Sequence, residues 1–241
     1  MLTKKIAVLY HVFYEDTYEQ IKNELEGLQG LNITYFFNLC VDMPNCIETK
    51  AYLVKHFPGC YVTISSNKGK DIGGKLLLLN LCLKVNVDFE WIIFLHDKKS
   101  LQALNAKTWK TELHKIIAKN LVSEIGKAIS NNPKCGIIAS KNYVKTELRE
   151  GRRFEGMNGA ILDELINSYG IHCKKYVYVA GTMFWAKASA LFEFFKTNDP
   201  LSIRQSLEAG NVIDNFKGTN THAWERVLSW IVLSKGFEIE T

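Results

Sequence analysis

The 241-residue sequence is poor in proline and has no paired-cysteine motif and no long apolar run. Its four prolines are scattered, so no proline-rich linker divides the chain. The six cysteines form no C-x-x-C pair, and no histidine lies at zinc-finger spacing, which favours reduced, buried thiols. They are Cys40, Cys46, Cys60, Cys82, Cys135 and Cys173. The apolar run at residues 6–10 is too short for a signal peptide or a membrane span, so we expect a cytoplasmic protein.

An excess of one charge is also lacking, since the formal net charge is only +5. That excess is too small to indicate a nucleic-acid partner, and it is consistent with an anionic ligand or an anionic membrane face. The hydrophobic fraction of 47% is enough for a substantial core without a metal or a disulfide. We therefore expect a single domain over residues 1–241.

What the sequence does have is a regular alternation of strand-like and helix-like segments. Apolar runs predict strands at residues 5–12, 33–39, 60–65, 90–95, 135–140 and 176–180. Helical patterns cover about residues 16–28, 48–56, 75–83, 106–131, 158–169, 188–196 and 221–234. This order predicts an α/β, Rossmann-type fold, with a mainly parallel sheet flanked by helices on both faces. We interpret the polar stretch at residues 141–156 as a mobile loop at a lobe boundary and as a candidate lid.

The loop at residues 65–74 combines three glycines, two lysines and an aspartate between a predicted strand and a predicted helix. Glycines let backbone amides approach a ligand, while a helix N-terminus and lysines favour anions, so the loop suits a diphosphate. The candidate ligand-binding residues are Asn67, Lys68, Gly69, Lys70, Asp71 and Gly73. The spacing matches neither the P-loop nor the dinucleotide fingerprint, and a tight turn with Asp71 as helix cap explains it equally well.

A second polar cluster, His96, Asp97, Lys98 and Lys99, follows the apolar strand at residues 90–95. Ligands of open α/β sheets bind beyond the carboxyl ends of the strands, where both clusters are expected to meet. A carboxylate pair there would hold Mg²⁺ or Mn²⁺ on a diphosphate, whereas lysines offset the phosphate charge directly. The single aspartate therefore predicts a site without a required metal, and a solvated charge run at a turn is the alternative.

Two further groups of candidates follow predicted strands. His11 and Tyr14 lie at the end of the first strand, where an aromatic ring can stack on a base and a histidine can reach a ribose or phosphate. Gly181, Thr182 and Trp185 follow the strand at residues 176–180 and suit the apolar face of a sugar ring. A structural histidine and ordinary core packing are the competing explanations.

The last predicted helix opens with His222, Glu225 and Arg226, which share one helical face. A carboxylate and an imidazole that face a cleft can supply a general base. The competing explanation is a capping box, with Thr221 or His222 as the cap, plus a surface ion pair.

Five segments, taken in order, resemble the rhamnan synthesis protein F family of glycosyltransferases. They are NKGKDIGG at 67–74, FLHDKKS at 94–100, WKTEL at 109–113, AGTMFWAKASAL at 180–191 and THAWER at 221–226. HVFY at 11–14 also resembles the family's opening strand. The resemblance covers nearly the whole chain. It implies a GT-A-like fold, a nucleotide-diphosphate-sugar donor, often dTDP-rhamnose, and a lipid-linked glycan acceptor at the inner membrane face.

Two departures from the family pattern are visible. Asp97 stands where the family has threonine, and the stretch at 211–215 is less acidic than expected. The first implies an altered phosphate or metal environment, and the second an altered sugar or acceptor specificity.

We therefore expect a glycosyltransferase that adds a sugar to a cell-surface polysaccharide such as O-antigen, capsule or rhamnan, with peripheral membrane association allowed. Residues 1–140 would form the nucleotide-binding half and residues 141–241 the acceptor and catalytic half, with Glu225 as general base beside His222 and Arg226. Two alternatives stay open. One is a sugar nucleotidyltransferase, and the other is a non-catalytic nucleotide- or glycan-binding module.

Overall fold

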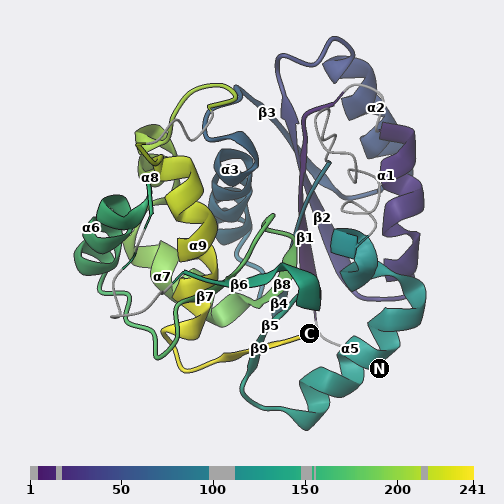
Figure 1. Ribbon diagram of the computed structural model, residues 1–241. Coiled ribbons are helices and arrows are strands. Elements are labelled where there is room, and N and C mark those ends of the chain that lie inside the picture. Colours follow the sequence, from purple (N-terminus) through teal and green to yellow (C-terminus); the bar gives the residue numbers. More distant parts are fainter. Residues whose placement is uncertain (1–4, 15–17, 98–111, 148–153, 155, 213–216) are drawn as a thin grey trace.

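The computed structural model describes residues 5–14, 18–97, 112–147, 154, 156–212 and 217–241, and its centre is a seven-stranded sheet (Figure 1). The strand order is β3-β2-β1-β4-β8-β5-β9. The strands are β1 (Ile6–Val12), β2 (Ile33–Cys40), β3 (Tyr61–Ser65), β4 (Trp91–His96), β5 (Cys135–Ile138), β8 (Phe184–Lys187) and β9 (Glu238–Glu240). All neighbours pair in parallel except those of β8, which runs antiparallel to β4 and β5. Strands from both halves of the chain thus share one sheet.

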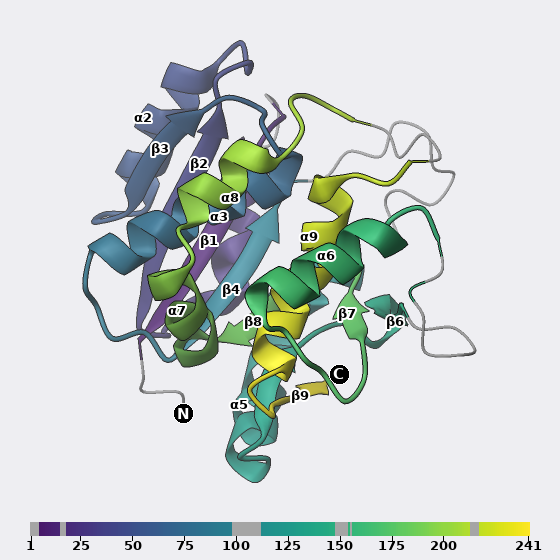
Figure 2. The ribbon, with the colours of Figure 1, turned by 90° about the vertical axis from the view of Figure 1, so that its left-hand side faces the viewer.

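Helices cover both faces of this sheet, as the two views of the ribbon show (Figures 1 and 2). One face carries α3 (Lys70–Lys84), α6 (Gly159–Tyr169), α7 (Ala188–Thr197), α8 (Pro200–Ser206) and α9 (Asn220–Leu233). The other carries α1 (Tyr18–Glu24), the 3₁₀ turn η1 (Leu25–Leu28), α2 (Cys46–His56), the 3₁₀ turn η2 (Lys115–Ile117) and α5 (Lys119–Asn131). The expected α/β fold with a mainly parallel sheet is confirmed. Within the described ranges, no helix combines the length and the apolar character needed to cross a bilayer.

The central strands supply two hydrophobic cores at once. Successive side chains of a strand point to opposite faces, so Ala7 and Leu9 pack in the core beneath α3, and Val8 and Tyr10 pack in the core beneath α1. Burial on both faces explains why these strands are continuous apolar runs rather than alternating ones. All six cysteines are free thiols.

The long helix expected at residues 106–131 is confirmed for residues 119–131, which form α5, but it is not continuous with the 3₁₀ turn η2 before it. Ala118 is extended, with φ −68° and ψ 135°, and this residue separates η2 from α5. The break packs closely against the 3₁₀ turn η1, because a Cβ on Gly27 would lie 2.0 Å from the carbonyl oxygen of Ile117. This contact joins segments far apart in the sequence, so no local signal marks the break.

The strand expected at residues 176–180 exists but belongs to a different sheet. It is β7 (Val177–Val179), which pairs antiparallel with β6 (Val144–Thr146) in a separate two-stranded sheet. β6 and the 3₁₀ turn η3 (Lys141–Tyr143) lie in the stretch that we interpreted as a loop, so that interpretation is wrong for residues 141–146. Residues 148–153 and 155 of the expected lid lie outside the described residues.

Candidate active site

A polar cavity of about 390 Å³ lies beyond the carboxyl end of β4, between the first turns of α3 and α9 and the turn that follows β7. Its size suits a small ligand, and its place is the one where open α/β sheets bind ligands. The lining residues are Lys70, Asp71, Ile72, His96, Tyr178, Ala180, Gly181, Thr182, Thr221, His222 and Glu225. This cavity is the candidate active site.

Two non-glycine residues of this cavity have a left-handed backbone. They are Lys70, with φ 50°, and Thr182, with φ 49°, and each follows a glycine that also has positive φ. A positive φ is costly for residues with a Cβ, and such residues cluster at functional sites. Backbone conformation therefore agrees with the cavity in pointing to this part of the molecule.

One side of the cavity is built on the fully buried side chain of Lys75, whose Nζ donates to Oδ2 of Asp71 at 2.8 Å, to Nδ1 of His96 at 3.1 Å and to the hydroxyl of Thr182. The Thr182 hydroxyl in turn donates to Asp71 Oδ2 at 2.6 Å. Burial alone would raise the pKa of Asp71, but the charge of Lys75 and the hydrogen bonds outweigh it and hold this pKa well below 3.8. Burial also lowers the pKa of Lys75 below 10.5, although Asp71 opposes that shift. Asp71 is thus a carboxylate with a matched counter-charge.

The other side of the cavity centres on Glu225. Its Oε1 accepts a hydrogen bond from the backbone N–H of Gly181 at 2.7 Å, and its Oε2 accepts one from Arg226 at 2.7 Å. Arg226 also binds Glu147 at 3.2 Å, and its guanidinium lies 4.5 Å from the ring centre of Tyr178. Burial would lower the pKa of Arg226, yet the surrounding negative charges raise it overall. Two carboxylates therefore share one guanidinium, and the cluster carries an excess negative charge.

The start of α9 is capped differently from our expectation. Thr219 is the N-cap, not Thr221 or His222, and its hydroxyl accepts a hydrogen bond from the backbone N–H of His222 at 3.1 Å. The carboxylate of Glu208 accepts from the backbone N–H of Asn220 at 2.7 Å and from that of Thr221 at 2.9 Å. Burial would raise the pKa of Glu208, and the hydrogen bonds lower it by more. Glu208 was not anticipated, because it reaches the helix across an intervening loop.

The glycines of the loop at residues 65–74 approach the protein's own atoms. A Cβ on Gly69 would lie 2.3 Å from Cδ1 of Leu207, and one on Gly73 would lie 1.8 Å from the carbonyl oxygen of Lys68. The backbone N–H of Gly69 donates to the carbonyl of Glu208 at 2.7 Å, so the segment that carries Glu208 packs against the loop. Internal packing therefore accounts for these glycines. The expectation that they let backbone amides approach a diphosphate is corrected for Gly69 and Gly73.

Asn67 and Lys68 also contact the segment that carries Glu208. The Asn67 side chain donates to Oδ1 of Asn211 at 3.1 Å, and Lys68 forms an isolated antiparallel bridge with Ala209. Of the six loop candidates, Lys70 and Asp71 line the cavity. The alternative with Asp71 as helix cap is also wrong, since Gly69 is the N-cap of α3.

His11 and Asp97 have structural partners away from the cavity. His11 is 2% exposed, and its Nδ1 accepts a hydrogen bond from Asn38 at 2.9 Å. Burial lowers the pKa of His11 to about 4. The carboxylate of Asp97 accepts from the backbone N–H groups of Phe13 and Tyr14 at 2.7 to 2.9 Å, so it fixes the chain that leaves β1. Neither side chain lines the cavity.

Trp185, expected beside a sugar, is instead a core residue. Its side chain is fully buried in β8, and its Nε1 donates to the carbonyl of Ile116 at 2.9 Å. The correction follows from β8, because this strand turns the tryptophan into the core beneath α1 and α5 rather than toward the cavity.

The structure thus brings together seven of the sequence-predicted site residues, namely Lys70, Asp71, His96, Gly181, Thr182, His222 and Glu225. Nine others do not line the cavity, namely His11, Tyr14, Asn67, Lys68, Gly69, Gly73, Asp97, Trp185 and Arg226. Lys98 and Lys99 lie outside the described residues. Lys75 was missed, although a lysine four residues after Asp71, directly before a run of leucines, is a readable signal. Among the residues that the structure describes, no group of three or more His, Cys, Asp or Glu side chains is arranged to hold a metal.

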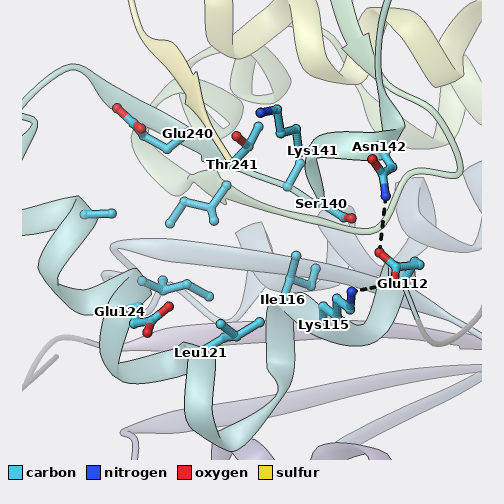
Figure 3. A pocket seen from close by; sticks show the side chains of 14 residues that line it. Glu112, Lys115, Ile116, Leu121, Glu124, Ser140, Lys141, Asn142, Glu240 and Thr241 are labelled. Carbon is cyan, nitrogen blue, oxygen red and sulfur yellow. Dashed lines mark hydrogen bonds and ion pairs between the residues drawn. The ribbon is translucent and has the colours of Figure 1, made fainter.

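A second cavity, of about 440 Å³, lies beside α5 and the ends of β5 and β9 (Figure 3). Ile116 and Leu121 contribute apolar surface to it, and Glu112 forms an ion pair with Lys115 and a hydrogen bond with Asn142 at its edge. No sequence-predicted site residue lines it. The smaller cavity is therefore the one that combines strained backbone with partly buried carboxylates.

The fold and this site define an α/β protein with a ligand-sized polar cavity beyond the carboxyl ends of its parallel strands. The family model of rhamnan synthesis protein F matches residues 1–237, and the chain belongs to that family. Membership supports the sequence-based expectation of a polysaccharide glycosyltransferase. No curated protein matches the sequence. Among solved structures, mouse xyloside xylosyltransferase 1 in its apo form is similar at 9% identity, covering 98% of this chain and 85% of that chain with a TM-score of 0.37.

Proposed function

We propose that the protein is a glycosyltransferase that moves a sugar from a nucleotide-diphosphate donor to a glycan acceptor in polysaccharide synthesis. The observation that carries this proposal is one cavity that presents two carboxylates, Asp71 and Glu225, in different electrostatic settings. Family membership adds the polysaccharide context. The donor sugar is proposed to be rhamnose, and the acceptor a lipid-linked glycan that the enzyme meets at the inner face of the membrane.

The side of the cavity around Asp71 suits a sugar better than a phosphate. Its carboxylate is balanced by Lys75, so it offers a hydrogen-bond acceptor without a net charge. Sugar hydroxyls are neutral donors and match such a group, whereas phosphate oxygens are acceptors and do not. The diphosphate would meet the charge of Lys70 at the cavity, and Lys98 and Lys99, which follow Asp97 in the sequence, would supply the charge that replaces a required metal ion.

Glu225 is proposed as the general base. Arg226 and the backbone N–H of Gly181 hold its carboxylate at the cavity wall, where it can accept a proton from an acceptor hydroxyl. In a direct displacement, the acceptor oxygen bonds to the anomeric carbon and its proton passes to Glu225. The bond from that carbon to the diphosphate oxygen breaks, and the nucleoside diphosphate leaves. Arg226 holds Glu225 in place, and His222 lines the same cavity.

The test is a product assay with dTDP-rhamnose, UDP-glucose and GDP-mannose as donor probes. Transfer or slow hydrolysis that releases a nucleoside diphosphate supports the proposal. Pyrophosphate release from a nucleoside triphosphate and a sugar phosphate would instead identify a nucleotidyltransferase, and binding without turnover would identify a binding module. A nucleoside diphosphate at about a hundred times its Kd should stabilise the fold by about 2.7 kcal/mol. If no nucleoside diphosphate shifts the melting temperature at millimolar concentration, the proposed donor site is refuted.

A further inference from the structure

The least expected group near the cavity is the ammonium of Lys75, which is fully buried next to the leucine run of helix α3. An ammonium has three N–H donors, and three acceptors surround this one, from Asp71, His96 and Thr182. Because an ammonium only donates, Nδ1 of His96 must accept, and the proton of the neutral ring is on Nε2. One lysine thus fixes the orientation of three side chains that line the cavity.

Stability alone is a poor reason to keep this arrangement. Removing an ammonium and a carboxylate from water is costly, and replacing a buried ion pair by apolar residues of similar volume is often neutral or stabilising. Neighbours such as Leu76, Leu78 and Leu79 show that this helix packs well with apolar side chains. A charged residue among them therefore points to a role at the cavity.

The network leaves one oxygen of Asp71 available. Oδ2 accepts from Lys75 and from Thr182, and within the described part of the chain no hydrogen bond reaches Oδ1. The Asp71 side chain is 24% exposed and lines the cavity, whereas Lys75 is fully covered. A ligand in the cavity can therefore touch Asp71 but not Lys75.

We propose that Lys75 is a positioning residue that keeps Asp71 ionised and directs its Oδ1 to a hydroxyl of the bound sugar. This inference rests on the proposed function, because it assigns the cavity to the sugar of the donor. Without Lys75, the Asp71 carboxylate would stay partly buried with no matched charge, and it would take up a proton more readily. Protonated Asp71 would offer a weaker acceptor to the sugar.

The test compares wild type with Lys75→Met, Asp71→Asn and the double variant Lys75→Met/Asp71→Asn. For each protein, the melting temperature and the donor KM and kcat are measured from pH 4.5 to 9, with the donor probe that wild type turns over. In Lys75→Met we expect donor KM to rise about tenfold or more at pH 6 and to recover partly at high pH. The acid limb of its kcat/KM profile should move up by about one pH unit or more. A lysine that merely supports the fold would lower the melting temperature by the same amount at every pH and leave the profile in place, which would overturn the inference.

The double variant keeps the test decisive if Lys75→Met fails to fold. It removes both charges, so it should recover most of the stability that Lys75→Met loses, while donor KM stays high and the shifted acid limb disappears. A double variant that is no more stable than Lys75→Met would contradict the coupling. Failure of wild type to turn over any donor would refute the proposed function, whereas the melting temperatures across pH still decide whether Lys75 controls the charge of Asp71.

Discussion

The two carboxylates of the cavity differ in how the neighbouring cations balance their charge. Asp71 faces one ammonium, and its pKa is held well below 3.8, so it is a poor proton acceptor and a good partner for a hydroxyl. Glu225 shares one guanidinium with Glu147, so that cluster keeps an excess negative charge. Two similar side chains thus differ in charge balance because of the number of cations beside them.

The largest effect is expected at Glu225. Glu225→Gln removes the proposed base but keeps an oxygen for the N–H of Gly181, so kcat should fall about 10²- to 10⁴-fold while donor Kd stays nearly unchanged. Single-turnover kinetics and donor titration give both values. Glu193→Gln is the matched control, because Glu193 also pairs with a cation, Lys235, but at an exposed site, and it should leave turnover unchanged. Turnover of Glu225→Gln within about threefold of wild type, with at most about 2 kcal/mol of stability lost, would assign Glu225 a structural role.

Acid should lower the stability of the fold beneath Asp71 through His11, which packs beneath α3 against Gly74. The folded pKa of His11 is about 4, below its ordinary value of 6.5, so the unfolded chain binds the extra proton first. The part of the stability that depends on His11 should therefore be unchanged above pH 6.5 and fall by about 3 kcal/mol as the pH drops to 4. Urea unfolding across this range measures the loss. His11→Gln should flatten the dependence, and an equal slope in that variant would exclude His11 as its source.

Asp71→Asn tests the contribution of the other carboxylate to donor binding. It removes a charged acceptor, and since such hydrogen bonds contribute about 1.5 to 3 kcal/mol, donor KM should rise roughly ten- to a hundredfold. The effect on kcat should be smaller than that of Glu225→Gln, because Asp71 is not the base. Steady-state kinetics on both variants provides the comparison. A larger loss of kcat in Asp71→Asn than in Glu225→Gln would exchange the two roles.

A smaller effect is expected at Glu208, which links the two sides of the cavity. Its backbone carbonyl binds Gly69 at the start of α3, and its carboxylate caps α9. Glu208→Gln should destabilise the protein by about 1 to 2 kcal/mol, because its hydrogen bonds to the α9 amides lose their charged acceptor. Urea unfolding measures this loss, and it should exceed that of Asp199→Asn, which alters the exposed cap of α8. Equal losses would show that Glu208 is an ordinary cap and no link between the two sides.

The smallest effect is expected from removing metal ions. If Lys98 and Lys99 balance the diphosphate, EDTA should leave donor Kd unchanged within about twofold, a difference of about 0.4 kcal/mol. Lys98→Ala or Lys99→Ala should weaken donor binding by more than EDTA does. Isothermal titration with each protein measures the affinities. Loss of binding on chelation, with recovery on addition of Mn²⁺, would contradict the metal-independent proposal.

The sequence predicted the layered fold because the strands are buried on both faces and therefore stand out as apolar runs. It also predicted that polar segments after the strands meet at one edge, and seven candidate residues do line one cavity. Their roles stay predictions. What failed depended on contacts between distant segments, such as Leu207 against Gly69, because a glycine signal is the same whether a ligand or the chain itself approaches. The prediction that Trp185 lies beside a sugar failed for the same reason, since the strands that pair with its own strand lie far away in the sequence.

The most direct test of the central claim is the release of a nucleoside diphosphate from dTDP-rhamnose, UDP-glucose or GDP-mannose, measured side by side for wild type, Glu225→Gln and Asp71→Asn. We expect wild type to turn over at least one donor. We also expect a loss confined mainly to kcat in Glu225→Gln and a loss mainly in KM in Asp71→Asn. Donor turnover that neither substitution affects would contradict the account, because the reaction would then occur outside this cavity.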